Sequence, residues 1–267
     1  MLARPLNSPR AGLLAGKSVL VTGAGSGIGR AIAGALAEAG ARIAVTDKDL
    51  PLAQSVAACL GEGHPAFACD VTIAASIEQA VRDAVAALGG LDVLCANAGV
   101  STMNPVKDLT EQEWDFNFAV NAKGVFLTNQ AVVRLWLAGG QQGVIVNTAS
   151  VAGKVGAPLL AHYCASKFAV VGFTQSLAKE VAANGIRVNC VCPGYVRTGM
   201  QTRELAWESR LRGLDPAKVQ AEYVALTPLG RLEEADDVAD AVLFLASDLS
   251  SFITGEALNV SGGAFMD

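Results

Sequence analysis

The chain has 267 residues, of which 52% are hydrophobic and 17% are charged. This composition is typical of a globular protein with a large core, and it excludes disordered and fibrous chains. The formal net charge of −5 argues against a nucleic-acid-binding surface. No apolar run approaches the roughly 18 residues that a membrane helix needs. We therefore expect neither nucleic acid nor a membrane as a partner.

The first 16 residues contain only a short apolar patch, around Leu13 and Leu14, which is too short for a secretory signal. Because no linker or change in composition divides the rest, we interpret 1–16 as an N-terminal tail and 17–267 as one domain. The six cysteines show no disulfide framework of the secreted type, so we expect free thiols and a cytoplasmic location. With only two histidines, His64 and His162, we expect no metal site. We interpret His162 as a loop or packing residue.

Short β-branched runs alternate with longer helical runs along the chain. Strands apolar on both faces and linked by helices imply a parallel sheet covered on both sides. The sequence therefore predicts a single doubly wound α/β domain of about seven strands. Buried strands are predicted over 18–21, 42–46, 66–69, 91–95, 144–148 and 187–192, with a C-terminal strand near 258–260. Helices are predicted over 28–39, 52–60, 73–88, 111–137 and 160–183.

A glycine-rich turn follows the first predicted strand, where ligands of such sheets bind. Gly23, Gly27 and Gly29 form a G-x-x-x-G-x-G pattern that opens the next predicted helix. Glycine lets the backbone turn sharply and approach a pyrophosphate, which then lies at the helix N-terminus. The pattern alone is also compatible with an ordinary turn. The strand before it, the helix after it and an acid about 20 residues later favour a dinucleotide site.

That acid is Asp47, at the end of the second predicted strand. A carboxylate there can accept hydrogen bonds from the adenosine ribose hydroxyls, whereas it repels a 2′-phosphate. Ser26 adds no positive charge in the glycine turn, and Lys48 is the competing cation that could reach a phosphate. We therefore predict NAD rather than NADP as the cofactor.

Tyr163 and Lys167 are four residues apart in a predicted helix, so the phenol and the ammonium share one face. A nearby positive charge favours the phenolate, so we expect Lys167 to lower the pKa of Tyr163. A tyrosine tuned in this way can exchange a proton with an alcohol or a carbonyl. The pair alone could be an ordinary surface pair, but its combination with the glycine turn indicates a catalytic site.

With these motifs the chain resembles the short-chain dehydrogenase/reductase family from about residue 17 to residue 263. The resemblance implies a Rossmann-type fold and hydride transfer between a nicotinamide cofactor and a secondary alcohol carbon. It assigns catalysis to Asn121, Ser150, Tyr163 and Lys167. Tyr163 would take the alcohol proton, Ser150 would bond the same oxygen, Lys167 would also bind the nicotinamide ribose, and Asn121 would fix a proton-relaying water. The cofactor-binding residues implied are Gly23, Ser26, Gly27, Ile28, Gly29, Asp47, Asp70, Val71, Asn97, Gly99, Tyr163, Lys167, Pro193, Gly194, Val196 and Thr198.

The segment 199–231 should form a small helical substrate lid, since it follows the Pro193-Gly194 motif. Its mixed polarity and its opening residues resemble relatives that act on polyols, sugars and small diols. A 3-oxoacyl-(acyl-carrier-protein)-reductase-like ketoreductase is the alternative, and a catalytically silent dinucleotide-sensing protein is a reading from another class. By analogy with the family we expect a homotetramer.

Overall fold

The computed structural model describes residues 10–266. In this part of the chain seven parallel strands form one sheet in the order β3-β2-β1-β4-β5-β6-β7. The order reverses between β1 and β4, which creates the switch point of a doubly wound sheet. The predicted fold class is confirmed. The strands are β1 (Ser18–Thr22), β2 (Arg42–Asp47), β3 (Ala66–Ala68), β4 (Val93–Ala96), β5 (Gly143–Thr148), β6 (Ile186–Pro193) and β7 (Ala257–Val260).

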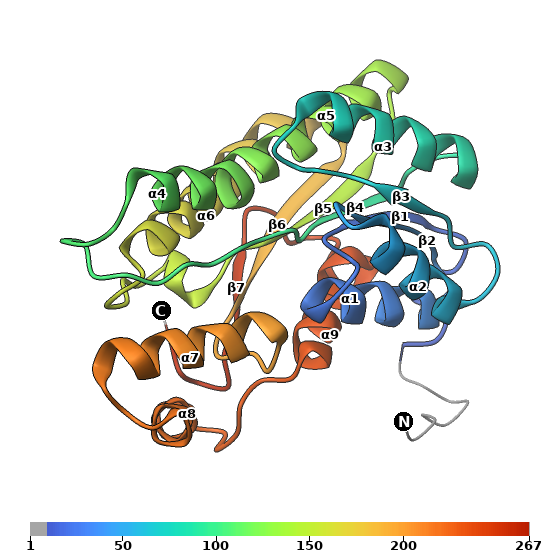
Figure 1. Cartoon of the computed structure of the whole chain (residues 1–267). Coiled ribbons are helices and arrows are strands. Elements are labelled where there is room, and N and C mark those ends of the chain that lie inside the picture. The colour runs from blue at the N-terminus through green and yellow to red at the C-terminus, as the bar shows by residue number, and fades with distance from the viewer. Residues whose placement is uncertain (1–9, 267) are drawn as a thin grey trace.

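Helices cover both faces of this sheet (Figure 1). One face carries α1 (Gly27–Glu38), α2 (Leu50–Leu60) and α9 (Ala235–Ala246). The other carries α3 (Ala74–Leu88), α5 (Gly124–Gly139) and α6 (Ala161–Val181), with α4 (Glu111–Asn117) beside α6. Two further helices, α7 (Gly199–Arg212) and α8 (Pro216–Ala225), pack against each other in the segment between β6 and α9.

Alternating side chains of each strand supply the two halves of the core. Val19 and Val21 of β1 pack into the cluster around α1 and α9, whereas Leu20 between them packs into the cluster around α3 and α5. This two-sided burial explains why the strands are continuously apolar rather than alternating. The edge strands β3 and β7 are exceptions, with mostly half-buried residues. Strand β3 was predicted as buried, but with one neighbouring strand its residues are half-buried or exposed.

The helix predicted over 111–137 is wrong in one respect. A π-helix, Phe118–Lys123, separates α4 from α5 and contains Asn121. A capping box of Thr110 and Glu113 begins α4, with the Glu113 amide donating to Thr110 Oγ1 over 3.2 Å. Insertions of this kind bulge a helix locally and are frequent at functional sites.

The end of the predicted tail packs on the domain from Arg10 onward. Leu14 is buried in the core beside α1, and its amide donates to the Ala39 carbonyl over 3.0 Å. Arg10 is 5% exposed and forms ion pairs with Glu38 of α1 and Asp240 of α9. Residues 10–16 therefore join these two helices ahead of β1.

All six cysteines are free thiols, and five of them are buried. Among residues 10–266 no helix is both long and apolar enough to cross a membrane. In the same range no three His, Cys, Asp or Glu side chains gather as a metal site would require.

Candidate active site

The glycine turn after β1 is tight enough to exclude side chains. A Cβ on Gly29 would lie 2.1 Å from the Gly23 carbonyl oxygen, and one on Gly23 would lie 2.8 Å from Ala98 Cα. Gly23 and Gly27 also have φ values of +63° and +52°, in the region that favours glycine. The turn therefore presents bare backbone at the switch point.

The N-terminus of α1 is open to an anionic ligand. Ser26 is the N-cap residue, but its side chain makes no capping hydrogen bond, and the first turn contains no acidic residue. Its backbone N–H groups are therefore available to a pyrophosphate. Ile28 is half-buried on this turn, and Thr198 lies 3.6 Å from the position of a Cβ on Gly27. The cradle fits the phosphates of a dinucleotide.

Asp47 ends β2 next to the glycine turn. Its Oδ2 accepts a hydrogen bond from the Gly25 amide over 3.0 Å, and its Oδ1 accepts from the Asp49 amide over 3.0 Å. The carboxylate is half-buried, so each oxygen retains a lone pair for a ribose hydroxyl. Asp47 therefore shapes the turn and places a carboxylate beside the glycine cradle.

Asp70 lies at the end of the next strand and is stabilised as a carboxylate. Hydrogen bonds from the Thr72 hydroxyl at 2.7 Å and the Thr72 amide at 2.9 Å hold its pKa below its usual range. The ammonium of Lys48 lowers that pKa further. The charge of Lys48 thus already acts on Asp70, one of the residues that the resemblance assigns to the cofactor.

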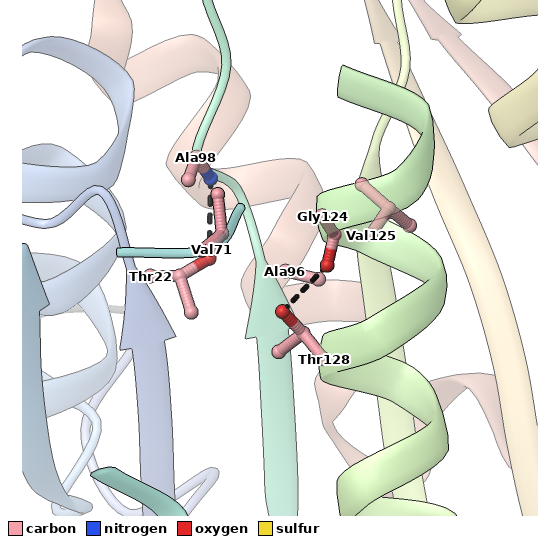
Figure 2. A pocket seen from close by; sticks show the side chains of 7 residues that line it. All are labelled: Thr22, Val71, Ala96, Ala98, Gly124, Val125 and Thr128. Atoms are coloured by element: carbon pink, nitrogen blue, oxygen red, sulfur yellow. Dashed lines mark hydrogen bonds between the residues drawn. The ribbon is translucent and has the colours of Figure 1, made fainter. Parts of the chain in front are cut away.

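Figure 2 shows a crevice behind this site, between the end of β1, Val71 and the start of α5. The Thr22 hydroxyl in it accepts a hydrogen bond from the Ala98 amide, and the Thr128 hydroxyl donates to the Gly124 carbonyl. Both hydroxyls are occupied by backbone groups and the space is about 140 Å³. The crevice is therefore a packing gap, too small to hold a dinucleotide.

Asn97 and Gly99 hold the loop after β4 against its neighbours. The Asn97 amide nitrogen Nδ2 donates to the Thr22 carbonyl over 3.1 Å, and its Oδ1 accepts from the Thr148 hydroxyl over 3.2 Å. Gly99 lies close to Lys167, whose Nζ would be 3.5 Å from a Cβ on this glycine. The loop that contains these two residues thus connects the carboxyl ends of β1, β4 and β5.

Asn121 uses its whole side chain inside the protein. Its Oδ1 accepts from the Val100 amide over 2.8 Å, while its Nδ2 donates to the Val100 carbonyl over 2.9 Å and to Ser166 Oγ over 3.0 Å. The side chain is fully buried. It therefore clamps the β4 loop to the π-helix and to α6, and the water-binding role remains a prediction.

Ser150, Tyr163 and Lys167 come together at the ends of β5 and α6. Lys167 is 3% exposed, its Nζ donates to the Thr148 carbonyl over 2.9 Å, and it lies 5.8 Å from the centroid of the Tyr163 ring. Burial lowers the pKa of Lys167 to about 8. Ser150 is buried at the end of β5, and its hydroxyl favours the Tyr163 phenolate.

The predicted lowering of the Tyr163 pKa is wrong for this structure. Burial raises the pKa of Tyr163 above its usual value, and the carboxylate of Glu204 raises it further. The hydrogen bond with Ser150 acts in the opposite direction but is the smaller effect. Desolvation of the phenolate therefore outweighs the stabilisation expected from its neighbours.

The loop after β6 is held by a residue that the sequence did not reveal. The Gly194 amide donates to the Val260 carbonyl over 3.0 Å and to Glu233 Oε2 over 2.8 Å. Val196 pairs with Glu233 in an isolated parallel bridge, and Thr198 caps α7 by accepting from the Gln201 amide. Glu233 is 7% exposed, and burial raises its pKa to about 8. This loop begins at Pro193, the last residue of β6.

Several partners of the predicted residues carry no signal in the sequence. Lys167 donates to the backbone carbonyl of Thr148, and Asn121 accepts from the backbone amide of Val100. Because every residue type offers these backbone groups, the side chains at positions 148 and 100 do not reveal the contacts. His162 is fully buried on α6, where its Nε2 pairs with the Thr102 hydroxyl at 2.7 Å. It is a packing residue, as predicted.

Known proteins resemble this chain over most of its length. The family model described as "Enoyl-(Acyl carrier protein) reductase" matches residues 23–264. The 2-(S)-hydroxypropyl-CoM dehydrogenase 3 of Xanthobacter autotrophicus is 42% identical over 92% of this chain and 95% of its own length. The D-threitol dehydrogenase of Mycolicibacterium smegmatis is 45% identical over 94% of this chain and 93% of its own length. A crystal structure of 3-ketoacyl-(acyl-carrier-protein) reductase from Brucella melitensis complexed with NADH has a TM-score of 0.86 at 34% identity, over 95% of this chain and 100% of that chain.

The fold and the site define an oxidoreductase that uses a nicotinamide dinucleotide. The cradle of bare backbone lies at the switch point of the sheet, where ligands of such sheets bind, and the Lys167 ammonium lies 5.8 Å from the centroid of the Tyr163 ring. The chain belongs to the short-chain dehydrogenase/reductase family, as its motifs predicted.

Proposed function

We propose that the protein is an NAD-dependent dehydrogenase of small secondary alcohols, most of all polyols, sugars or diols. The observation that carries this proposal is the cluster of Ser150, Tyr163 and Lys167 beside a glycine cradle with Asp47 at its far end. The relative named D-threitol dehydrogenase supports a polyol, and the relative solved with NADH supports NAD. The six free thiols support a cytoplasmic location.

In this proposal the bound nicotinamide supplies the hydride chemistry and the protein supplies the proton chemistry. Tyr163 takes the proton of the substrate hydroxyl, and Ser150 bonds the same oxygen. Lys167 holds positive charge under the phenol, which favours its ionised form, and binds the nicotinamide ribose. Pro193, Gly194, Val196 and Thr198 line the nicotinamide end, and 199–231 covers the substrate as a lid.

The raised pKa of Tyr163 bears on this mechanism. A phenol that holds its proton tightly is a good acid for carbonyl reduction and a poor base for alcohol oxidation. We therefore expect oxidation to require alkaline pH. The charge of Lys167, whose pKa of about 8 leaves it mostly protonated at pH 7, opposes this effect.

The alternative is a ketoreductase of the 3-oxoacyl type, which the relative from Brucella melitensis supports. A silent dinucleotide sensor is the less favoured reading, because Ser150, Tyr163, Lys167 and Asn121 are all present. One experiment separates the three functions. Initial rates are measured with NAD and NADP on a panel of polyols and simple secondary alcohols, and with NADH and NADPH on a 3-oxoacyl thioester. NADH binding is followed by fluorescence quenching.

The proposal expects turnover of a polyol with NAD. Efficient reduction of the thioester with no polyol turnover would establish the ketoreductase instead. Quenching of NADH without any turnover would establish the sensor.

A further inference from the structure

Helix α7 carries one row of charged side chains, and the first of them acts on Tyr163. Glu204, Glu208 and Arg212 are spaced four residues apart and therefore share a face. The negative charge of Glu208 is balanced by Arg212, with which it forms an ion pair at 2.6 Å. Glu208 also accepts a hydrogen bond from the Tyr223 hydroxyl. Glu204 forms no ion pair within residues 10–266, although the charge of the neighbouring Arg203 favours its ionised form. It is the acid of this row that has no basic side chain within ion-pair distance.

The position of Glu204 places it at the substrate end of the site. Its carboxyl acts electrostatically on the phenol of Tyr163, and it faces the hydroxyl of Ser101, which favours its ionised form. Ser101 belongs to the loop after β4, whereas Glu204 belongs to the lid. Glu204 therefore interacts with two separate elements, through the phenol of Tyr163 on α6 and through the Ser101 hydroxyl on the loop after β4.

Ser101 is an independent indication that a ligand group belongs here. Its side chain is 5% exposed, and its Oγ is a buried polar atom without a hydrogen bond of normal geometry. An unsatisfied buried hydroxyl is unfavourable in a folded protein and needs an explanation. The neighbouring Val100 is held by the Asn121 clamp, so Ser101 cannot easily turn away.

We propose that Glu204 and Ser101 form a subsite for a second hydroxyl of the substrate, close to the hydroxyl that reacts at Tyr163. The carboxylate accepts a hydrogen bond from this second hydroxyl, and Ser101 donates one to it. The inference rests on the proposed function and names its substrate class as vicinal diols. The same carboxylate disfavours substrates with an anionic group next to the carbinol.

A neutral hydroxyl fits this subsite better than an ammonium group. Burial raises the pKa of Glu204, which shows that its surroundings disfavour isolated charge. Ser101 offers a donor as well as an acceptor, and a hydroxyl can use both, whereas an ammonium group can only donate. An amino alcohol is therefore the competing ligand that the experiment must include.

The test compares butane-2,3-diol with butan-2-ol, which differ by the second hydroxyl, at saturating NAD. The variants are Glu204→Met, which removes the acceptor at similar size, Glu204→Gln and Ser101→Ala. Glu222→Gln is the control, because Glu222 is a lid acid on α8 that pairs with Arg212 of α7 and is not among the groups that act on Tyr163. Melting temperatures establish that each variant is folded.

We expect Glu204→Met to lower kcat/KM for the diol by roughly 10- to 100-fold, the worth of one hydrogen bond to a charged group. For butan-2-ol we expect a change in kcat/KM below about threefold. Ser101→Ala should also lower kcat/KM more for the diol than for butan-2-ol, but by a smaller factor than Glu204→Met. Glu222→Gln should match the wild type on both alcohols. If Glu204→Met fails to fold, the subsite is tested by the ratio of kcat/KM for the diol to kcat/KM for butan-2-ol in Glu204→Gln and Ser101→Ala.

Equal loss on both alcohols, or no preference of the wild type for the diol, would overturn the subsite while leaving the dehydrogenase intact. A clear preference for 1-aminopropan-2-ol over propane-1,2-diol would show that the subsite binds an ammonium group and would overturn the hydroxyl assignment. No turnover of any alcohol with either cofactor would overturn the proposed function and the subsite together.

Discussion

Two opposing effects act on the proton of Tyr163. Burial of the phenol and the nearby Glu204 carboxylate favour the neutral form, whereas Ser150 favours the phenolate. Lys167 is itself buried and its pKa falls to about 8, so its charge is retained only in part under alkaline conditions. The acid–base behaviour of the site is therefore set by desolvation as much as by the pairing of tyrosine with lysine.

We predict that Tyr163→Phe abolishes turnover while NADH binding stays nearly intact. The phenol exchanges the proton but is not a main anchor of the cofactor, and loss of a general acid or base costs on the order of 10²- to 10⁴-fold. Lys167→Ala should damage both rate and binding, since one ammonium serves the ribose and the phenol. Steady-state rates and calorimetric NADH binding measure the two effects. A turnover rate of Tyr163→Phe within about tenfold of the wild-type rate would contradict the catalytic role of Tyr163.

Asp47 leads to a prediction about cofactor choice. If repulsion of a 2′-phosphate costs about 2 to 4 kcal/mol, NAD should exceed NADP by roughly 30- to 1,000-fold in kcat/KM. Asp47→Asn should shrink this ratio while still accepting the hydrogen bond from Gly25, so it isolates the charge. Asp47→Ala with Ser26→Arg should shift preference toward NADP, because arginine grips a phosphate bidentately. Equal use of NAD and NADP by the wild type would mean that Lys48 reaches the phosphate.

At the scale of single elements, the sequence predicted what depends on periodicity and side-chain chemistry. The glycine turn, the acid after β2 and the Tyr163–Lys167 pair could be found because their residue types are required. The π-helix could not be found, because Phe118–Lys123 has the composition of an ordinary helix. It depends on the tertiary clamp between Asn121 and Val100, which no local pattern encodes. The missed roles of Glu233 and Ser101 likewise depend on contacts between distant segments.

Helix α1 offers a matched pair of glycines. A Cβ on Gly29 would lie 2.1 Å from the Gly23 carbonyl oxygen and 2.5 Å from Asn97 Nδ2, whereas one on Gly34 meets nothing within 4 Å. We predict that Gly29→Ala lowers stability by several kcal/mol and abolishes NADH binding, because the turn must open. Gly34→Ala should raise stability by about 0.5 to 1 kcal/mol through helix propensity. Chemical denaturation checks both, and similar behaviour of the two variants would contradict the fit at the turn.

Glu233 gives the loop after β6 a pH dependence. Its pKa is about 8 in the folded protein against an ordinary 4.5, so the folded state holds the proton more tightly than the unfolded one. The unfolding free energy from this group is therefore greatest below pH 4.5 and falls as pH rises toward 8. We predict that Glu233→Gln removes this fall, on the order of 3 kcal/mol between pH 5 and 8. Urea unfolding across this range measures it, and parallel curves for wild type and variant would refute the assignment.

At the scale of the whole molecule, two sets of exposed apolar side chains within residues 10–266 bear on assembly. One consists of Trp114, Phe116, Phe126 and Phe168 on α4, α5 and α6, each more than 40% exposed. These helices lie on the same face of the sheet (Figure 1). The other contains Leu249 and Phe252, which precede β7 and are 65% and 103% exposed. Exposed apolar patches of this kind mark protein–protein interfaces.

Two separate patches are what a tetramer with dihedral symmetry requires, because each two-fold axis needs its own self-complementary surface. We predict a homotetramer in solution at micromolar concentration. Phe168→Glu should disrupt one interface and Phe252→Glu the other, so each variant should leave dimers and the double variant monomers. Lys107→Glu is the control, since this exposed side chain pairs only with its neighbour Asp108. Light scattering on the wild type and the four variants measures the masses, and a stable wild-type monomer would contradict the prediction.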